Sequence, residues 1–328
     1  MPRRLSVTVE TFELAQAFTI ARGSKREARV VVAHLEDGAH HGLGECVPYA
    51  RYGESAEGVV AAIETVRASV ENGLSRKELR IAMRPGAARN ALDCALWDLE
   101  AKTAGRSVAS MIGENVLRPI DTAYTISLGS PEEMAAATKA AADRSLLKVK
   151  VGGGEGDIER IRAVRSQSGG ARLILDANEG WTEDTIRPNM LAAAEAGAVL
   201  VEQPLPSDRD GILAHIPHPV PICADESLHV SNDLAGLIDR YDYVNIKLDK
   251  TGGLTEALSL MQAAREAGFG VMVGCMVSSS LAMAPAVLLA QGADLVDLDG
   301  PLLMKTDRPH GLLYEGSTVA PPSPLLWG

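Results

Sequence analysis

The stretch Leu146-Leu-Lys-Val-Lys150 decides the fold, because it is a short apolar run that ends in charge and similar runs recur down the chain. Seven further runs are predicted to be strands, at residues 123–126, 173–175, 199–201, 220–223, 243–246, 269–273 and 295–298. Between the runs at residues 123–126 and 146–150, Ser130-Pro-Glu-Glu133 is typical of a helix start, with a capping box and a proline in the first turn. Eight βα-type units with buried strands favour a parallel barrel over an open doubly wound sheet.

The first third of the chain has a different pattern. Alternating apolar residues predict three antiparallel strands, and apolar residues at helical spacing predict two helices, at residues 5–12, 28–35, 42–46, 55–70 and 92–99. Two segments, 16–25 and 44–55, are predicted to be loops and are candidates for a lid.

Composition excludes several classes of protein. The 328 residues carry a formal net charge of −11, which disfavours nucleic acid and anionic membranes as partners. The four cysteines lie far apart without a CxxC pair, and no apolar leader precedes the first strand, so a cytoplasmic protein is expected. The uncharged stretch 267–293 is interrupted by glycines, serines and Pro285, and is predicted to be buried core rather than a membrane span.

A charged residue follows most of the predicted barrel strands. Lys150, Asp176, Glu202, Asp225 and Lys247 come after five successive runs, at intervals close to one βα unit. Any one of them is equally well explained as the first solvated residue of a loop. As a set they are expected to meet at the carboxyl-terminal face, where barrel enzymes keep their chemistry.

The three acids in this set suggest a metal. Asp176, Glu202 and Asp225 supply only hard oxygen ligands, one from each of three adjacent strands. Such ligands suit Mg²⁺, or Mn²⁺ as a substitute, and disfavour zinc. The histidines show no metal-binding spacing.

The lysines suggest acid–base chemistry. Lys148 and Lys150 are two residues apart on one strand and therefore project to the same face, and Lys247 lies four strands further round the barrel. Neighbouring ammonium groups and a divalent ion are expected to lower a lysine pKa enough for it to act as a base. A carbon acid between Lys150 and Lys247 could lose a proton to one and gain one from the other.

Several motifs together resemble the muconate lactonizing enzyme subgroup of the enolase superfamily. They are Lys148-x-Lys150, Asp176-x-Asn178, Glu202-Gln-Pro204, Asp225-Glu-Ser227 and Asn245-Ile-Lys247 followed by Gly252-Gly253. The resemblance implies an α/β fold, a modified (β/α)7β TIM-type barrel at residues 116–304. It also implies an α+β capping domain at residues 1–115, completed by residues 305–328. Homo-oligomers are common in this family.

The resemblance also implies roles for these residues. Asp176, Glu202 and Asp225 would bind Mg²⁺, Lys150 and Lys247 would be the two acid/base catalysts, and Lys148 would neutralise the substrate carboxylate. A histidine at the end of strand seven, which mandelate-racemase-like members use, is absent, because that strand ends Val271-Met-Val-Gly274.

Two further features resemble the dipeptide epimerases of this subgroup. Asp297-Leu-Asp299, followed by Gly300-Pro301, resembles the pair of acids that holds the free ammonium group of a dipeptide. Arg22 matches a loop arginine that meets the side-chain carboxylate of a C-terminal glutamate, a role that suits a planar guanidinium. The implied reaction is Mg²⁺-dependent epimerisation of Ala-Glu dipeptides from murein at the glutamate α-carbon.

Three alternatives use the same residues differently. Other reactions of the subgroup are o-succinylbenzoate synthesis, muconate cycloisomerisation and N-acylamino acid racemisation, whose substrates lack the ammonium group that Asp297 and Asp299 would bind. A Schiff-base aldolase would use Lys247 as a nucleophile but leaves the three acids without a role. A non-catalytic metal-binding barrel would leave the two opposed lysines unexplained.

Overall fold

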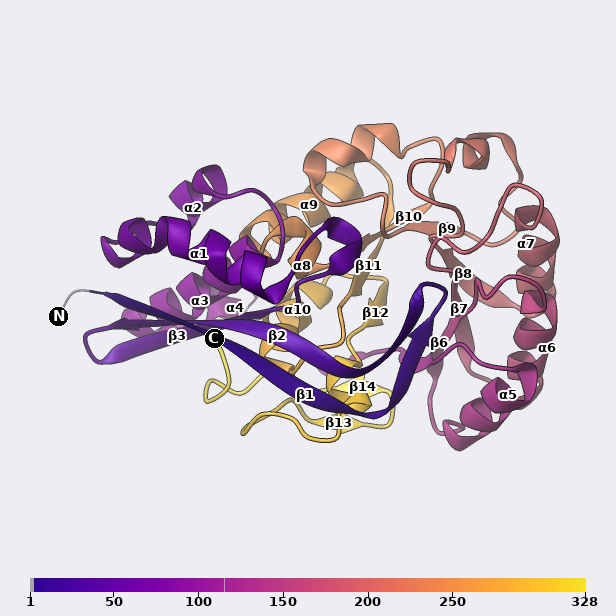
Figure 1. Cartoon of the computed structure of the whole chain (residues 1–328), viewed down its shortest axis with the longest axis horizontal. Helices are drawn as coiled ribbons and strands as arrows, with labels where there is room; N and C mark the ends of the chain where they lie inside the picture. The colour runs from indigo at the N-terminus through magenta and orange to yellow at the C-terminus, as the bar shows by residue number, and fades with distance from the viewer. Residues whose placement is uncertain (1–2, 115) are drawn as a thin grey trace.

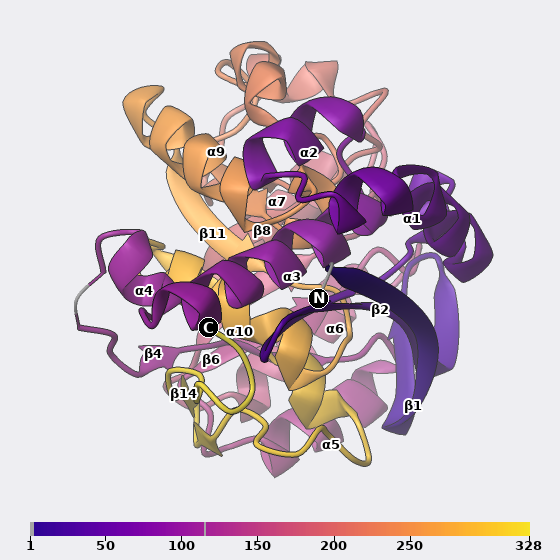
Figure 2. The same cartoon turned by 90° about the vertical axis from the view of Figure 1, so that its left-hand side faces the viewer.

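The computed structural model describes residues 3–114 and 116–328, and it divides into a cap and a barrel (Figure 1). The cap begins with an antiparallel sheet of three strands in the order β1-β2-β3, at Arg4–Ile20, Gly23–Asp37 and His40–Cys46. A short 3-10 turn and four helices follow, namely η1 (Ala50–Tyr52), α1 (Ala56–Glu71), α2 (Arg76–Ala82), α3 (Ala87–Ala104) and α4 (Val108–Met111). The helices pack on one side of this sheet (Figure 2).

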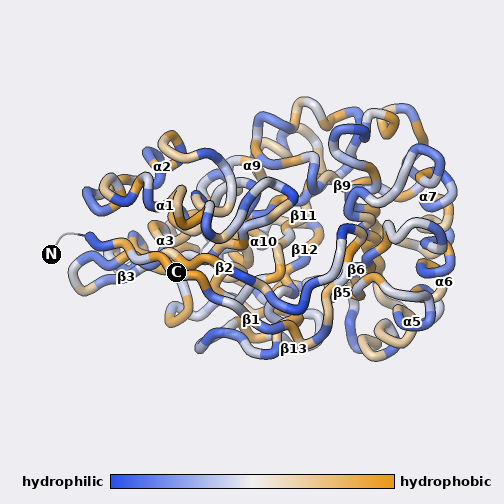
Figure 3. The backbone as a smooth tube through the Cα atoms, viewed as in Figure 1, coloured by the Kyte–Doolittle hydropathy of each residue, from blue (hydrophilic) through white to orange (hydrophobic). Residues whose placement is uncertain are grey.

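The barrel confirms the eight predicted parallel strands, which pair in the order β12-β11-β10-β9-β8-β7-β6-β5. Their bounds are β5 (Tyr124–Ile126), β6 (Leu146–Lys150), β7 (Arg172–Asp176), β8 (Ala198–Glu202), β9 (Ile222–Ala224), β10 (Tyr243–Ile246), β11 (Gly270–Gly274) and β12 (Leu295–Asp297). A hydrogen bond of 2.8 Å from the Ala123 backbone N–H to the Val296 carbonyl joins the two ends of the sheet. These strands are hydrophobic, whereas the tip of the β1–β2 hairpin is hydrophilic (Figure 3).

The connections between strands differ in length. Helices follow most strands, at α5 (Pro131–Ala140), α6 (Asp157–Gln167), α7 (Ile186–Glu195), α8 (Leu248–Thr251), α9 (Leu254–Glu266) and α10 (Ser280–Ala290). After β8, β9 and β12 the described chain forms only 3-10 turns, at η2 (Gly211–His215), η3 (Ser231–Gly236) and η4 (Gly300–Leu303). Ser130 caps α5 with the reciprocal Glu133 contact that its sequence predicts. The last strand is therefore followed by no full helix, as a (β/α)7β barrel requires.

The C-terminal segment returns to the cap. Its strands β13 (Tyr314–Glu315) and β14 (Thr318–Val319) form a small sheet with β4 (Ile120–Asp121). Beyond them the buried Trp327 indole donates a hydrogen bond of 3.1 Å to the Cys94 carbonyl in α3. This contact joins the end of the chain to the cap.

The stretch 267–293 behaves as its sequence predicts. It includes β11 and the buried helix α10, joined by a loop that contains Ser278 and Ser279, while Ser280 is the first residue of α10. Within the described residues, no helix is both long enough and apolar enough to cross a membrane.

The expectation of a loop at residues 16–25 is wrong. β1 and β2 continue their pairing across this segment, with Phe18 opposite Lys25 and Ile20 opposite Gly23, after an irregularity between Glu13 and Phe18. The backbone N–H of Leu128 in the barrel donates to the Thr19 carbonyl at 3.0 Å. Pairing to β2 and this barrel contact satisfy backbone groups that a free loop would expose to water. The hairpin therefore reaches over the carboxyl-terminal face of the barrel (Figure 1).

Asp249 joins the barrel to the cap and makes stability depend on pH. Its Oδ1 accepts hydrogen bonds from the Val47 backbone N–H and the Asn90 amide, both at 2.9 Å. Burial, aided by the charges of Glu54 and Glu45, raises the pKa of this carboxyl to about 7. Between about pH 4 and pH 7 the folded protein keeps a proton that the unfolded chain has lost. The free energy of unfolding therefore falls as the pH rises through this range to about 7.

We expect Asp249→Asn to match the wild type in stability at pH 4 and to be more stable at pH 8, by at least about 1 kcal/mol. The amide oxygen can accept the same two hydrogen bonds without a charge. Urea unfolding at both pH values measures the difference, with Asp208→Asn as an exposed control. Equal pH dependence in wild type and Asp249→Asn would contradict the prediction.

Candidate active site

The inward face of β6 sets three layers inside the barrel. Leu146 belongs to a small apolar cluster that fills the interior with one residue from most strands, including Ile174 and Met272. Lys148 and Lys150 follow at two-residue intervals and therefore lie successively nearer the carboxyl-terminal mouth. Lys148 is 1% exposed and Lys150 is 6% exposed, so both ammonium groups are largely withdrawn from water.

The three acids lie side by side at the ends of neighbouring strands. Asp176 on β7 is paired in register with Lys150 on one side and with Glu202 on the other. Asp225 follows β9, the next strand along. All three carboxylates are buried. The expected cluster at the carboxyl-terminal face therefore forms.

Lysines pair with each of these acids. Lys148 Nζ lies 2.8 Å from Glu202 Oε2, 3.1 Å from Asp176 Oδ2 and 2.8 Å from Asp297 Oδ2. Lys150 donates to Asp176 at 2.6 Å, and Lys247 donates to Asp225 at 2.6 Å. The two lysines expected to be bases are thus held four strands apart, each on a different acid.

The carboxylates control the charge states of this cluster. Burial and the charge of Asp176 raise the pKa of Glu202 to about 7. Burial would also raise the pKa of Asp225, but Lys247 and Lys250 outweigh it and hold that pKa well below its usual range. Burial would lower the pKa of Lys247, yet Asp225 raises it well above its usual value, although Lys148 opposes this shift. The expected lowering of a lysine pKa by its neighbour is therefore outweighed here by the acids.

Part of this cluster suits a hard divalent cation. Glu202 Oε2 is buried, and its polar contact in the described residues is the ion pair with Lys148 at 2.8 Å, while its Oε1 accepts a hydrogen bond from the Asn245 amide at 2.8 Å. Three carboxylates from adjacent strands form a donor set suited to Mg²⁺. In residues 3–114 and 116–328 no group of three acidic, histidine or cysteine side chains already has the arrangement needed to hold a metal ion. The lysine contacts described above occupy the same carboxylates.

Asp297 and Asp299 lie at the end of β12. This strand is on the other side of Lys148 from β7, β8 and β9, which position the three acids. Asp297 pairs with Lys148 through Oδ2, but its buried Oδ1 forms no hydrogen bond in the described chain. Asp299 accepts a hydrogen bond of 2.7 Å from the Thr125 backbone N–H. Burial and the charge of Asp297 raise the pKa of Asp299 to about 7. Two close carboxyl groups of this kind suit an ammonium group as ligand.

Arg22 lies at the hairpin turn and is held by the protein itself. Its Nη1 donates to the Asn178 carbonyl at 2.7 Å and to Glu179 at 3.2 Å. Its Nη2 donates to Glu226 at 2.7 Å and to the Tyr49 hydroxyl at 2.9 Å. Arg22 thus fastens the hairpin to the loops after β7 and β9.

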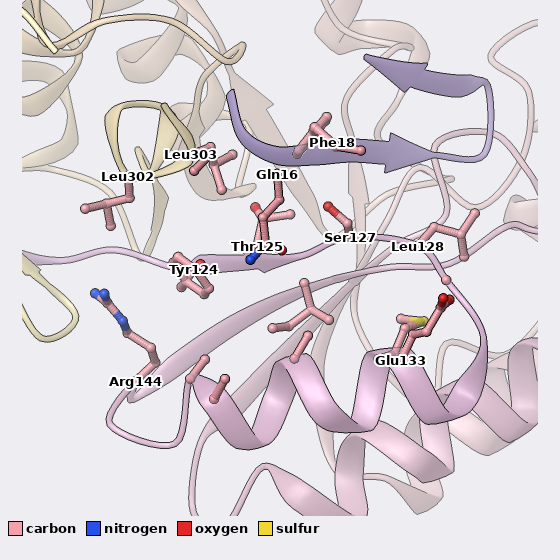
Figure 4. A pocket seen from close by; sticks show the side chains of 18 of the residues that line it. Gln16, Phe18, Tyr124, Thr125, Ser127, Leu128, Glu133, Arg144, Leu302 and Leu303 are labelled. Carbon is pink, nitrogen blue, oxygen red and sulfur yellow. The ribbon is translucent and has the colours of Figure 1, made fainter. Parts of the chain in front are cut away.

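Most of the predicted site residues border one narrow cavity at the barrel mouth. Asp176 and Glu202 are not in its lining but reach it through their lysine partners; the predicted residues that do line it are Arg22, Lys148, Lys150, Asp225, Lys247, Asp297 and Asp299. A larger cavity of about 500 Å³ lies between β5, α5 and the hairpin, and contains Tyr124, Glu133 and Arg144 (Figure 4). Its charged groups do not converge, so the narrow cavity is the candidate active site.

Sequence reasoning missed several polar residues around this cavity. Lys250 is 1% exposed and donates to both the carbonyl and the Oδ1 of Asp225. Glu226, next to Asp225, holds Arg22, and Lys25 lines the cavity from the hairpin. The position of Lys250, three residues after Lys247, was the only local signal for it.

The fold and this arrangement of acids and lysines define the class of protein. The chain belongs to the mandelate racemase / muconate lactonizing enzyme family of the enolase superfamily. Residues 4–113 match the N-terminal domain of the mandelate racemase / muconate lactonizing enzymes, and residues 132–303 match the enolase C-terminal domain-like family.

Individual relatives are more specific. The chain is 46% identical to an L-Ala-D/L-Glu epimerase of Escherichia coli, over 95% of this chain and 98% of that protein. It is 44% identical to an N-acetyl-D-glutamate racemase of a Pseudoalteromonas species, over 91% of this chain and 95% of that protein.

Solved structures agree with this similarity. An enolase family member from Agrobacterium tumefaciens with homology to dipeptide epimerases, solved with bound sodium and L-Ala-L-Glu, is 56% identical with a TM-score of 0.98, over 100% of both chains. A dipeptide epimerase of Enterococcus faecalis, complexed with Mg and L-Leu-L-Tyr, is 28% identical with a TM-score of 0.91, over 99% of both chains.

Proposed function

We propose that this protein catalyses the Mg²⁺-dependent epimerisation of L-Ala-D/L-Glu dipeptides by two-base 1,1-proton transfer at the glutamate α-carbon. The observation that carries the proposal is the placement of Lys150 and Lys247 four strands apart around one cavity, each on its own acid. Two bases on opposite sides of a carbon can remove a proton from one face and return it to the other.

Asp176, Glu202 and Asp225 would hold the metal, with Mn²⁺ as a substitute. When bound, Mg²⁺ supplies positive charge beside the α-carboxylate, where the negative charge of the deprotonated substrate gathers. Lys148, central in the cluster, would neutralise the same carboxylate. Asp225 raises the pKa of Lys247, so a positive charge that offsets Asp225 would leave a larger fraction of Lys247 neutral and able to accept a proton.

The ends of the substrate would be held by different groups. Asp297 and Asp299 would bind the alanine ammonium group, which could donate to Asp297 Oδ1, the oxygen of Asp297 that Lys148 does not contact. Arg22 would clamp the glutamate side-chain carboxylate from the hairpin, exchanging part of its present contacts. We place the reaction in the cytoplasm, on dipeptides released from murein.

A second candidate is the racemisation of N-acylated glutamate, favoured by the similarity to the Pseudoalteromonas racemase. It would use the same lysines, acids and side-chain clamp, but its substrate has no ammonium group. Asp297 and Asp299 distinguish the two candidates. A pair of buried acids binds a charged ammonium group more strongly than it binds an uncharged amide.

Deuterium uptake in D₂O with Mg²⁺ tests this choice. We expect the wild type to prefer L-Ala-L-Glu over N-acetyl-L-glutamate, and Asp299→Asn to lower kcat/KM for the dipeptide alone by about 10- to 100-fold. Asp184→Asn, on an exposed loop, is the control. Faster exchange of N-acetylglutamate by the wild type would favour the second candidate, and no exchange with either substrate would exclude both.

A further inference from the structure

Two motif residues beside the proposed metal ligands have no role in the proposed mechanism. Gln203 follows Glu202, and Ser227 lies two residues after Asp225. Gln203 is fully buried, and its φ of 34° lies in the left-handed region that residues with a Cβ seldom adopt. Such a conformation persists only where surrounding contacts hold it, and it is common at functional sites. The contacts that hold Gln203 in this conformation therefore indicate its role.

The side-chain carbonyl of Gln203 holds the loop that carries Asp225. Its Oε1 accepts hydrogen bonds from the backbone N–H of Asp225 at 2.8 Å and from that of Ser227 at 3.1 Å. Because backbone N–H groups can only donate, these contacts fix the oxygen end of the amide toward the loop. The Gln203 backbone N–H also donates to the carbonyl of Cys223 in β9, at 2.9 Å. Gln203 thus holds the backbone of Asp225 from two sides.

The backbone of Gln203 also contacts the loop that carries Asp176. Its carbonyl accepts a hydrogen bond of 2.9 Å from the backbone N–H of Glu179. Asn178 and Glu179 in that loop have positive φ values as well, of 45° and 68°. This hydrogen bond therefore joins two left-handed turns, one after β7 and one after β8. Because Gln203 also follows Glu202 directly, this one residue connects the chain segments of all three proposed metal ligands.

Three further side chains hold the nitrogen end of the amide. Gln203 Nε2 donates to the hydroxyls of Ser227 and Tyr241, both at 2.9 Å. It also donates to the Leu205 carbonyl at 2.9 Å. The two hydroxyls donate in turn to the buried Asp210, at 2.7 Å and 2.6 Å, which leaves their oxygens to accept from the amide. The Gln203 side chain is therefore held in one orientation at both ends.

Positioning of this kind matters more for Mg²⁺ than for a larger cation. Mg²⁺ requires near-ideal octahedral geometry with short ligand distances, whereas Ca²⁺ accepts longer distances and less regular arrangements of oxygen ligands. If the segments that carry the three acids could shift relative to one another, affinity for Mg²⁺ would therefore fall before affinity for Ca²⁺.

We propose that Gln203 is a positioning residue of the metal site, which holds the segments of Asp176, Glu202 and Asp225 in the arrangement that Mg²⁺ requires. The inference rests on the metal ligands of the proposed function. Both ends of the Gln203 amide are committed to partners within the protein. Gln203 would thus act through the acids and would not touch the metal or the substrate.

Metal binding in the absence of substrate tests this role. Titration calorimetry measures the dissociation constants of Mg²⁺ and Ca²⁺ for the wild type and each variant, and thermal unfolding checks that each variant is folded. Gln203→Leu keeps the approximate size of the side chain but removes both ends of the amide. Tyr241→Phe is a milder variant, which removes one hydroxyl that accepts from the amide. Trp327→Phe loses a buried hydrogen bond in the cap and is the control for a general loss of stability.

We expect Gln203→Leu to weaken Mg²⁺ binding by about 10- to 100-fold, the usual effect of residues that orient metal ligands. Its preference for Mg²⁺ over Ca²⁺ should fall by at least about fivefold, because Ca²⁺ tolerates irregular geometry. Tyr241→Phe should weaken Mg²⁺ binding by about 3- to 10-fold, the size of one hydrogen bond. Trp327→Phe should lower Tm and leave both dissociation constants unchanged.

Wild-type Mg²⁺ affinity in Gln203→Leu, an equal weakening of Mg²⁺ and Ca²⁺, or the same loss in Trp327→Phe would overturn the role of Gln203. If Gln203→Leu does not fold, wild-type Mg²⁺ affinity in Tyr241→Phe would overturn it instead. A wild type that binds no Mg²⁺ would overturn the proposed ligands and this inference together. A wild type that binds Mg²⁺ but exchanges no L-Ala-Glu proton would overturn the proposed function alone.

Discussion

Lys150→Ala and Lys247→Ala are each expected to abolish epimerisation of L-Ala-Glu, with a loss of at least about 10²- to 10⁴-fold, the usual contribution of a positioned acid or base. Each variant keeps one lysine, and that lysine reaches only one face of the α-carbon. We therefore expect each variant to exchange the α-proton of only one epimer with solvent, and the two variants to act on opposite epimers.

The measurement is deuterium uptake from D₂O by L-Ala-L-Glu and L-Ala-D-Glu supplied separately, with optical rotation as the readout of epimerisation. Lys139→Ala, the same substitution at an exposed lysine of α5, is the control for lysine loss as such. Near wild-type epimerisation by either active-site variant, or exchange of the same epimer by both, would contradict a two-base mechanism. The ion pairs of these lysines make a fold check necessary, because each substitution removes one of the two lysines that pair with a buried acid.

Glu202→Gln is expected to weaken Mg²⁺ binding by at least about 100-fold. Even residues that only hydrogen-bond to a metal ligand contribute about 10- to 100-fold to metal affinity, and a direct ligand contributes more. The substitution suits this position. Since the pKa of Glu202 is raised to about 7, a neutral side chain is close to a state that the folded protein already adopts. Asn245 can still donate to the amide oxygen. The fold should therefore survive while the metal site does not.

Two readouts separate binding from catalysis. Titration calorimetry with Mg²⁺ measures affinity, and the Mg²⁺-induced rise of Tm reports the same binding through its coupling to folding. Removal of metal by EDTA should stop exchange in the wild type, and added Mg²⁺ should restore it. Glu183→Gln, at an exposed position, is the control. Wild-type Mg²⁺ affinity in Glu202→Gln would remove this carboxylate from the proposed ligand set.

Two of the proposed metal ligands also contact the proposed bases. Lys150 and Lys247 donate to Asp176 and Asp225, the acids proposed to bind the metal. Asp176 and Asp225 would thus both hold the metal and orient the two lysines.

The barrel could be predicted from sequence because its signals are local. An apolar strand buried on both faces is a continuous run, and its last residue is read directly from the chain, as with Lys150, Asp176 and Glu202. Alternation then orders Leu146, Lys148 and Lys150 from the interior to the mouth. Because the spacing is regular and the connections are short, the meeting of the strand ends can be predicted without knowledge of any long-range contact.

The hairpin could not be predicted in the same way. Whether residues 16–25 pair as strands depends on β2 and on the Thr19 contact with Leu128, more than a hundred residues away. The same holds for Arg22, whose partners Asn178, Glu179 and Glu226 come from barrel loops. Lys25 carries no motif, and only the register opposite Phe18 places it in the cavity.

The sequence by itself therefore determined the eight strands, the order of charges around the barrel and the choice of candidate acids and lysines, because each follows from periodicity within a few residues. The tertiary structure alone decided which acid each lysine pairs with and which way each pKa shifts. Those properties depend on distance and burial, and both are set by segments far apart in the chain.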